Sequence, residues 1–173
     1  MASGCTAPMP DATEERAATN QSIVGGGTSN GHDGVVLISN GGSPWCTGSL
    51  ITPNLVLTAR HCVTEFYEQT NCGSMKRDVP ASVFTVSTGL YPNGQQVAAR
   101  GSKLFVPNAN NVFCGNDIAL IALDKDVTGV TPLKLRWSGA GPSETGTAVG
   151  YGASGQSGPP ARRERSGVAV LAI

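Results

Sequence analysis

Two segments of the sequence carry side chains that together could move a proton. His61 follows the apolar run 55–57, and Asp117 directly precedes the apolar run 118–123. An imidazole accepts a proton near neutral pH, and a carboxylate beside it holds the ring in one tautomer and stabilises its protonated form. Each residue alone also has a structural interpretation: His61 as a packed histidine, and Asp117 as an acceptor for backbone N–H groups where a strand begins.

The elements that would position these two residues are predicted to be short β-strands. Apolar runs of strand length alternate with turn residues, and the chain contains 23 glycines and 11 prolines. The predicted strands lie at residues 35–38, 48–51, 55–58, 83–86, 97–99, 103–106, 118–123 and 147–150. Regularly spaced short strands of this kind are typical of an all-β sandwich or barrel.

The charge and cysteine content exclude some classes of protein and indicate a compartment. The 12 basic and 12 acidic residues leave no net charge, whereas a nucleic-acid-binding surface needs an excess of Lys and Arg. No apolar run approaches the roughly 18 residues of a membrane-spanning helix. With two histidines and no Cys-x-x-Cys spacing, no metal site is expected. Five cysteines in 173 residues indicate an exported protein stabilised by disulfides.

Five motifs occur in the order in which trypsin/chymotrypsin-like serine proteases carry them, and together they resemble that family. The segments are Ile23-Val24-Gly25-Gly26, Trp45-Cys46-Thr47-Gly48-Ser49-Leu50-Ile51, Thr58-Ala59-Arg60-His61-Cys62, Asn116-Asp117-Ile118-Ala119-Leu120 and Val149-Gly150-Tyr151-Gly152. In turn they resemble the family's mature N-terminus, its Cys-Gly-Gly-Ser-Leu-Ile strand, Thr-Ala-Ala-His-Cys, Asn-Asp-Ile-Ala-Leu and the Gly-Trp-Gly strand of its second barrel.

The resemblance implies an all-β protein with a trypsin-like double β-barrel, of which the first barrel is complete and the second only begun. Residues 1–22 would be a propeptide or flexible tether, residues 23–135 the first barrel, and residues 136–173 a linker with the opening strands of the second. His61 would be the general base and Asp117 its orienting residue in a serine endopeptidase that acts on proteins or peptides. No cofactor is implied.

The nucleophile of that reaction has no counterpart in the chain. The family's Gly-Asp-Ser-Gly-Gly-Pro segment lies far beyond the Gly-Trp-Gly strand, whereas this sequence continues for only 21 residues after Gly152. Ser157, in the segment 155–160, follows that strand directly and is predicted to be a turn serine. We therefore expect the chain alone to be inactive, because the catalytic Ser and its oxyanion hole are missing. The apolar run that ends at Ile173 predicts that a further segment or chain completes the fold.

Three further departures from the family concern activation and the surroundings of the histidine. Ser22 precedes Ile23, so maturation of a zymogen at this bond would need a protease other than trypsin. Arg60 stands where the family has a small alanine, and it is expected either in solvent or beside Asp117. The interval of 56 residues between His61 and Asp117 is longer than usual.

The five cysteines are predicted to form two disulfides and to leave one residue over. The predicted pairs are Cys46 with Cys62 and Cys72 with Cys114. The first pair would hold His61 at the end of a hairpin, and the second would tie the longer interval to the strand that carries Asp117. Cys5 is left unpaired with two open interpretations: a leftover thiol in a tail, or the lipid-attachment site of a bacterial lipoprotein, which Ala2-Ser3-Gly4-Cys5 resembles.

Two alternatives to a truncated endopeptidase stay open. The chain could be a protease-like binding module without catalysis, or one chain of a two-chain protease whose nucleophile lies on a separate polypeptide. The expected location is secreted or in the cell envelope, with membrane contact only through a lipid on Cys5. The basic cluster 161–165 is predicted to be a solvated hairpin tip or, alternatively, a site of proteolytic nicking.

Overall fold

The structure is a computed structural model, and the described part of it comprises residues 23, 26–67, 74–92, 96–107, 112–141, 143–152 and 160–170. Regular structure in this part of the chain is β-strand, apart from two 3-10 turns, η1 (Arg60–Cys62) and η2 (Ala81–Val83). The predicted all-β class is therefore confirmed. Within the same residues, no helix has the length and apolar character needed to cross a membrane.

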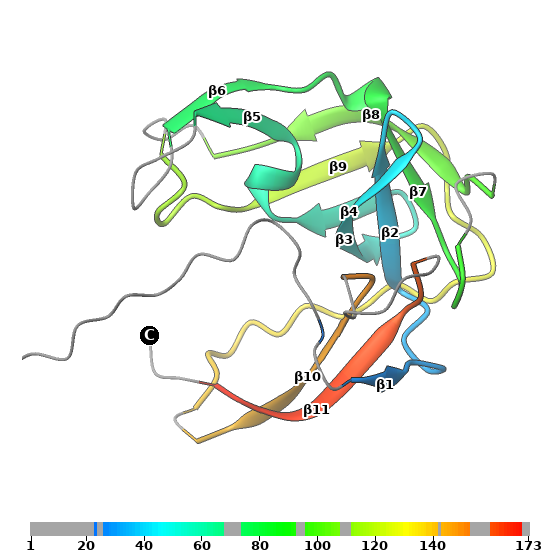
Figure 1. Ribbon diagram of the computed structural model, residues 1–173, viewed down its shortest axis with the longest axis vertical. Helices are drawn as coiled ribbons and strands as arrows, with labels where there is room; N and C mark the ends of the chain where they lie inside the picture. Colours follow the sequence, from blue (N-terminus) through cyan, green and yellow to red (C-terminus); the bar gives the residue numbers. More distant parts are fainter. Residues whose placement is uncertain are drawn as a thin grey trace, which may run out of the picture.

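Six antiparallel strands close into a barrel, which forms the upper part of the view in Figure 1. Going around the barrel, the strands are β2 (Val35–Asn40), β3 (Ser43–Thr52), β4 (Leu55–Thr58), β9 (Ala119–Leu123), β8 (Ala99–Phe105) and β7 (Phe84–Ser87). Because β7 pairs with β2, this sheet leaves no free edge. A separate hairpin, β5 (Thr64–Tyr67) and β6 (Ser74–Asp78), lies at one end of the barrel.

The strand β2 is buried on both of its faces, which explains its uninterrupted apolar run. Val36 and Ile38 point into the barrel, where they pack with Leu50, Val56, Phe84 and Ile121. Val35 and Leu37 point outward and pack against Tyr151. A strand with solvent on one face would alternate apolar with polar residues, so the run at 35–38 indicates a second layer over the barrel.

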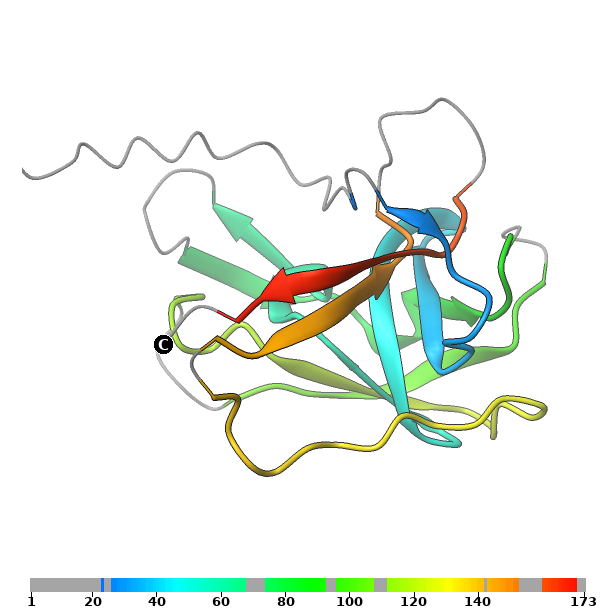
Figure 2. The same cartoon turned by 90° about the horizontal axis from the view of Figure 1, so that it is seen from below.

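That second layer is a three-stranded antiparallel sheet. Its strands, in spatial order, are β1 (Gly27–Thr28), β11 (Arg163–Ala169) and β10 (Thr145–Gly150). Figures 1 and 2 show this sheet beside the barrel, next to β2. It is the part of the expected second barrel that the described chain contains, so the fold class of a trypsin-like double barrel with an incomplete second half is confirmed. The domain boundaries at 22/23 and 135/136 stay a prediction.

Tyr151 fastens the small sheet to the barrel. Its backbone N–H donates to the Thr47 hydroxyl at 2.9 Å, and its own hydroxyl lies 2.6 Å from the Gly89 carbonyl and 3.2 Å from that of Val35. The preceding residue has to be glycine, because a Cβ on Gly150 would lie 2.8 Å from the Thr47 hydroxyl oxygen. Burial raises the pKa of the Tyr151 phenol, so the hydroxyl stays a donor over the physiological range.

The basic cluster 161–165 is not a solvated hairpin tip, and this expectation was wrong. Arg162 is 1% exposed, and the three residues that follow it belong to β11, which pairs with strands on both sides. The Arg162 guanidinium donates to the carboxylate of Asp33 at 2.6 Å and to the Ser29 carbonyl at 3.3 Å. Arg162 therefore joins the start of β11 to the loop that follows β1.

Three polar side chains lie on the solvent side of this contact between the small sheet and the loop after β1. One oxygen of Glu164 accepts a hydrogen bond from the Ser29 hydroxyl at 2.7 Å and lies 3.0 Å from His32 Nδ1. The hydrogen bond from Ser29, and to a lesser degree that from His32, lowers the pKa of Glu164 below its ordinary value of 4.5. The ionised carboxylate is therefore the form that the folded chain favours.

We expect the substitution Glu164→Gln to destabilise the chain in a pH-dependent way. The folded-state pKa lies below the unfolded-state value, so the carboxylate's contribution is complete above about pH 4.5 and is lost as the pH falls through the folded-state value. The melting temperature of the variant, measured by circular dichroism, should lie below wild type at neutral pH and approach it at acid pH. Ser29→Ala should remove most of this pH dependence, and a difference that stays constant with pH would contradict the assignment.

Candidate active site

Strand pairing brings the two candidate residues together from opposite ends of a 56-residue interval. The antiparallel register of β4 and β9 sets Thr58 opposite Ala119. His61 comes three residues after the end of β4, and Asp117 comes two residues before the start of β9. Residues that leave one strand and residues that enter its antiparallel partner must meet at the same edge of the sheet.

Asp117 contacts His61 at two points. One carboxylate oxygen lies 2.8 Å from the ring atom Nδ1, and the other accepts a hydrogen bond from the His61 backbone N–H, also at 2.8 Å. Because a carboxylate accepts hydrogen bonds, Nδ1 carries the proton and Nε2 is left with a lone pair. The side chains of His61 and Asp117 are 30% and 39% exposed, so Nε2 can meet a group that arrives from outside.

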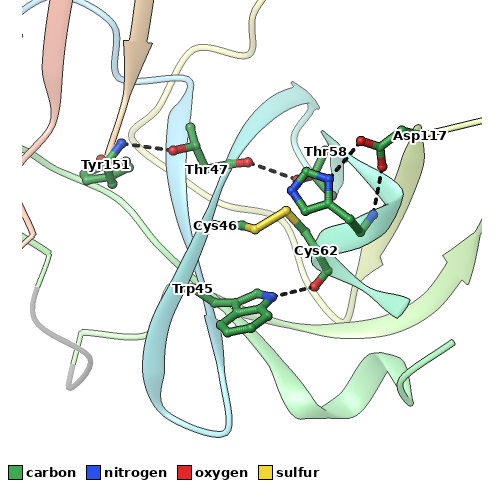
Figure 3. The surroundings of a disulfide bond; sticks show 8 residues. Trp45, Cys46, Thr47, Thr58, Cys62, Asp117 and Tyr151 are labelled. Carbon is green, nitrogen blue, oxygen red and sulfur yellow. Dashed lines mark hydrogen bonds and ion pairs between the residues drawn. A yellow bond between two sulfur atoms is a disulfide. The ribbon is translucent and has the colours of Figure 1, made fainter. Parts of the chain in front are cut away.

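The turn η1, which carries His61, is held to β3 by covalent and polar links. A disulfide joins Cys46 on β3 to Cys62, as predicted, with a Cα–Cα distance of 6.1 Å. The Trp45 indole N–H donates to the Cys62 carbonyl at 2.9 Å (Figure 3). On the other flank, the Thr58 hydroxyl donates to the Thr47 carbonyl at 3.0 Å. These links limit how far the turn can move relative to the barrel.

Arg60 takes neither of the two positions expected from the sequence. Its side chain is 8% exposed, so it does not extend into solvent, and its contacts are not with Asp117. The guanidinium donates to the Pro107 carbonyl at 3.2 Å and lies 3.6 Å from a carboxylate oxygen of Asp78 on β6. Pattern analysis missed Asp78 because only the pairing of β5 with β6 sets this residue opposite Thr64, close to the turn.

A cavity of about 450 Å³ lies between the barrel and the small sheet. Its walls come from β3, β4, β10 and Ile23, and they include Thr58, three residues before the histidine. Ile23 is partly buried at this place. Ser22, the other residue of the predicted maturation bond, lies outside the described residues, so cleavage at this bond stays a prediction.

The sulfur atoms of Cys46 and Cys62 and a ring nitrogen of His61 lie within 4.8 Å of one another. Zinc binds cysteine as a thiolate, and the sulfurs of this pair are joined in a disulfide, which carries no such charge. This donor set therefore does not fit a metal ion.

The other cysteines are only partly covered by the structure. Cys114 is disulfide-bonded, whereas Cys72 and Cys5 lie outside the described residues. The pairing of Cys72 with Cys114 and the free state of Cys5 therefore stay predictions. The same holds for Ser157 and for Ile173, which also lie outside the described residues.

Comparison with known proteins places most of the chain in one family. Residues 23–171 match the sequence profile of the family described as trypsin. Among curated proteins, proproteinase E of Bos taurus is 38% identical over 84 residues, which correspond to 46% of this chain and 29% of that protein. The match therefore covers less than a third of the length of this relative.

We expect removal of the Cys46–Cys62 disulfide to lower the free energy of unfolding while the strands still form. The bridge closes a loop of 16 residues. A disulfide that closes a loop of this size adds about 3 kcal/mol to the free energy of unfolding, because it lowers the entropy of the unfolded chain. Urea unfolding of Cys46→Ser/Cys62→Ser should show this loss relative to wild type. Cys5→Ser, which leaves both predicted disulfides intact, should unfold with the wild-type midpoint. A double variant as stable as wild type would contradict the expectation.

Proposed function

The chain belongs to the trypsin family of serine proteases, and we propose that it supplies the histidine and aspartate of a serine endopeptidase active site. The observation that carries this proposal is the two-point contact of Asp117 with His61. A single hydrogen bond would let the ring rotate about the contact. Two contacts to one carboxylate hold both the ring and the backbone beneath it, which a general base needs if its free nitrogen is to face the reacting group.

In this proposal His61 Nε2 takes the proton from a serine hydroxyl as that hydroxyl attacks a peptide carbonyl. The imidazolium that forms stays hydrogen-bonded through Nδ1 to Asp117, whose negative charge stabilises it. The same proton then passes to the leaving amine, and a water molecule releases the acyl group by the same sequence of steps. The described geometry supports both proton transfers, because Nδ1 is occupied and Nε2 is left to accept.

The serine itself is proposed to come from a segment or chain outside these 173 residues. The sequence contains no Gly-Asp-Ser-Gly-Gly-Pro segment, and Ser157 comes only five residues after Gly152. The cavity between β3, β4 and β10 supports this proposal, since it leaves space beside Thr58, at the end of the strand that leads to the general base. The chain alone is accordingly proposed to be inactive.

Labelling with a fluorophosphonate tests the proposal, because this reagent reacts with a serine that a general base has activated. The 173-residue chain should take up no label, whereas the product of the complete reading frame should be labelled. In that product Asp117→Asn should slow labelling by about 10⁴-fold, since the amide imposes the wrong tautomer on the histidine. Asp124→Asn is the matched control, because Asp124 lies just beyond the other end of β9 and bonds the Arg100 N–H.

Two outcomes would contradict the proposal. Label on a serine of the 173-residue chain would show that the nucleophile lies within it. A complete product that folds but takes up no label would favour the protease-like binding module. Label that appears only after a second polypeptide is added would identify the two-chain enzyme.

We also propose that the protein acts outside the cytosol. The Cys46–Cys62 bridge and the disulfide of Cys114 support this location, because disulfides persist in oxidising compartments. If Cys5 carries a lipid, expression of the complete gene with radiolabelled palmitate should label the protein, and Cys5→Ser should abolish the label. Absence of label from a protein with Cys5 intact would leave this residue as a free thiol.

A further inference from the structure

Arg60 places a buried guanidinium directly next to the general base in the sequence. It occupies the position where the resembled pattern has a small alanine, and its side chain is 8% exposed. A buried charge costs free energy unless it is paired, and here one nitrogen, Nε, has no hydrogen-bond partner in the described part of the chain. An alanine would avoid this cost. The contacts that the guanidinium makes must therefore offset this cost.

The contacts of Arg60 connect three segments, two of which also meet at the isolated β-bridge between Ser74 and Val112. One arm of the guanidinium bonds the carbonyl of Pro107, which follows β8 on the way to Asp117. The other arm faces Asp78 at the end of β6, and the same carboxylate oxygen accepts the Thr64 hydroxyl at 2.6 Å. The backbone of Arg60 itself belongs to η1. One side chain thus ties together the histidine-bearing turn, the β5–β6 hairpin and the segment before the aspartate.

We propose that Arg60 is a positioning residue for the His61–Asp117 pair. The inference rests on the proposed function in one respect, namely that this pair is the catalytic one. The planar guanidinium presents its donors in a fixed fork, so its two arms set the distance between two segments as well as supplying a charge. With the fork in place, η1 cannot shift relative to the segment that leads to Asp117, and the contact between Nδ1 and the carboxylate keeps its length.

Nuclear magnetic resonance of the 173-residue chain tests this proposal without any need for the nucleophile. The Nδ1 proton of His61 exchanges with water more slowly when it is hydrogen-bonded to Asp117. In Arg60→Met, which keeps the side-chain volume and removes the fork, its exchange should become about tenfold faster, equivalent to about 1.4 kcal/mol of lost hydrogen-bond free energy. Arg60→Lys retains the charge but not the fork, and it should restore the slow exchange only in part.

The matched control is Arg77→Met. Arg77 lies on the same strand as Asp78, but its side chain is 74% exposed and it pairs with Glu65. Exchange at His61 should be unchanged in this variant. The only other histidine, His32, lies in the junction with the small sheet and provides an internal reference that none of these variants should affect.

The outcomes separate positioning from a purely structural role. Exchange at His61 that is equal in wild type, Arg60→Met and Arg77→Met would overturn the proposal. Should Arg60→Met fail to give a folded spectrum, Arg60→Lys decides: faster exchange at His61 with an unchanged His32 signal supports positioning, and wild-type exchange overturns it. In the complete product, a positioning role predicts a lower kcat with an unchanged KM, because Arg60 contacts no substrate. A product that takes up no fluorophosphonate would refute the proposed function and leave the exchange result intact.

Discussion

The antiparallel pairing of β4 with β9 is the constraint on which the candidate site depends. Thr58 lies opposite Ala119, and the residues that extend from these two strand ends are the ones that meet in the His61–Asp117 contact. The contact is therefore a consequence of register. A shift of one residue in this pair would turn the apolar side chains of β9 away from the core, so the burial that stabilises the barrel also fixes the distance between imidazole and carboxylate. Stability and site geometry share one cause here.

The second sheet has a different relation to the barrel, since no strand ladder connects the two. The outer side chains of β2 pack against Tyr151, and the tyrosine in turn bonds backbone atoms of the barrel. The two approach each other closely at Gly150, where a side chain would meet Thr47. Packing and a few buried hydrogen bonds thus hold the two sheets together. An arrangement of this kind leaves space between layers, as the cavity beside β10 shows.

The sequence was sufficient to predict the all-β class, the strands of the barrel, the meeting of His61 with Asp117 and the Cys46–Cys62 bridge. It did not predict β1, β5 or β6, and it divided β8 into two runs. Strand periodicity and short motifs are local signals, and the order of the five motifs carried the resemblance to a family, which in turn implied the barrel. The positions of Arg60 and Arg162 were predicted incorrectly, because each depends on segments far away in the chain: Pro107 and Asp78 for the first, Asp33 for the second. An arginine in a polar segment is most often exposed, and no local pattern distinguishes the buried exceptions.

Arg60 and Arg162 make the same kinds of contact, and these contacts indicate the role of a buried charge in a chain with few charged residues. These two arginines are the buried charged side chains in the described part of the protein. Each guanidinium contacts one carboxylate and one backbone carbonyl: Asp78 and Pro107 in one case, Asp33 and Ser29 in the other. In both cases the carbonyl belongs to a segment outside the strands. A hydrophobic residue could fill the same volume, but it could not bond a carbonyl that the ladders leave unpaired. The forked cations therefore fix the irregular segments of the fold, and Arg60 does so at the turn that presents His61.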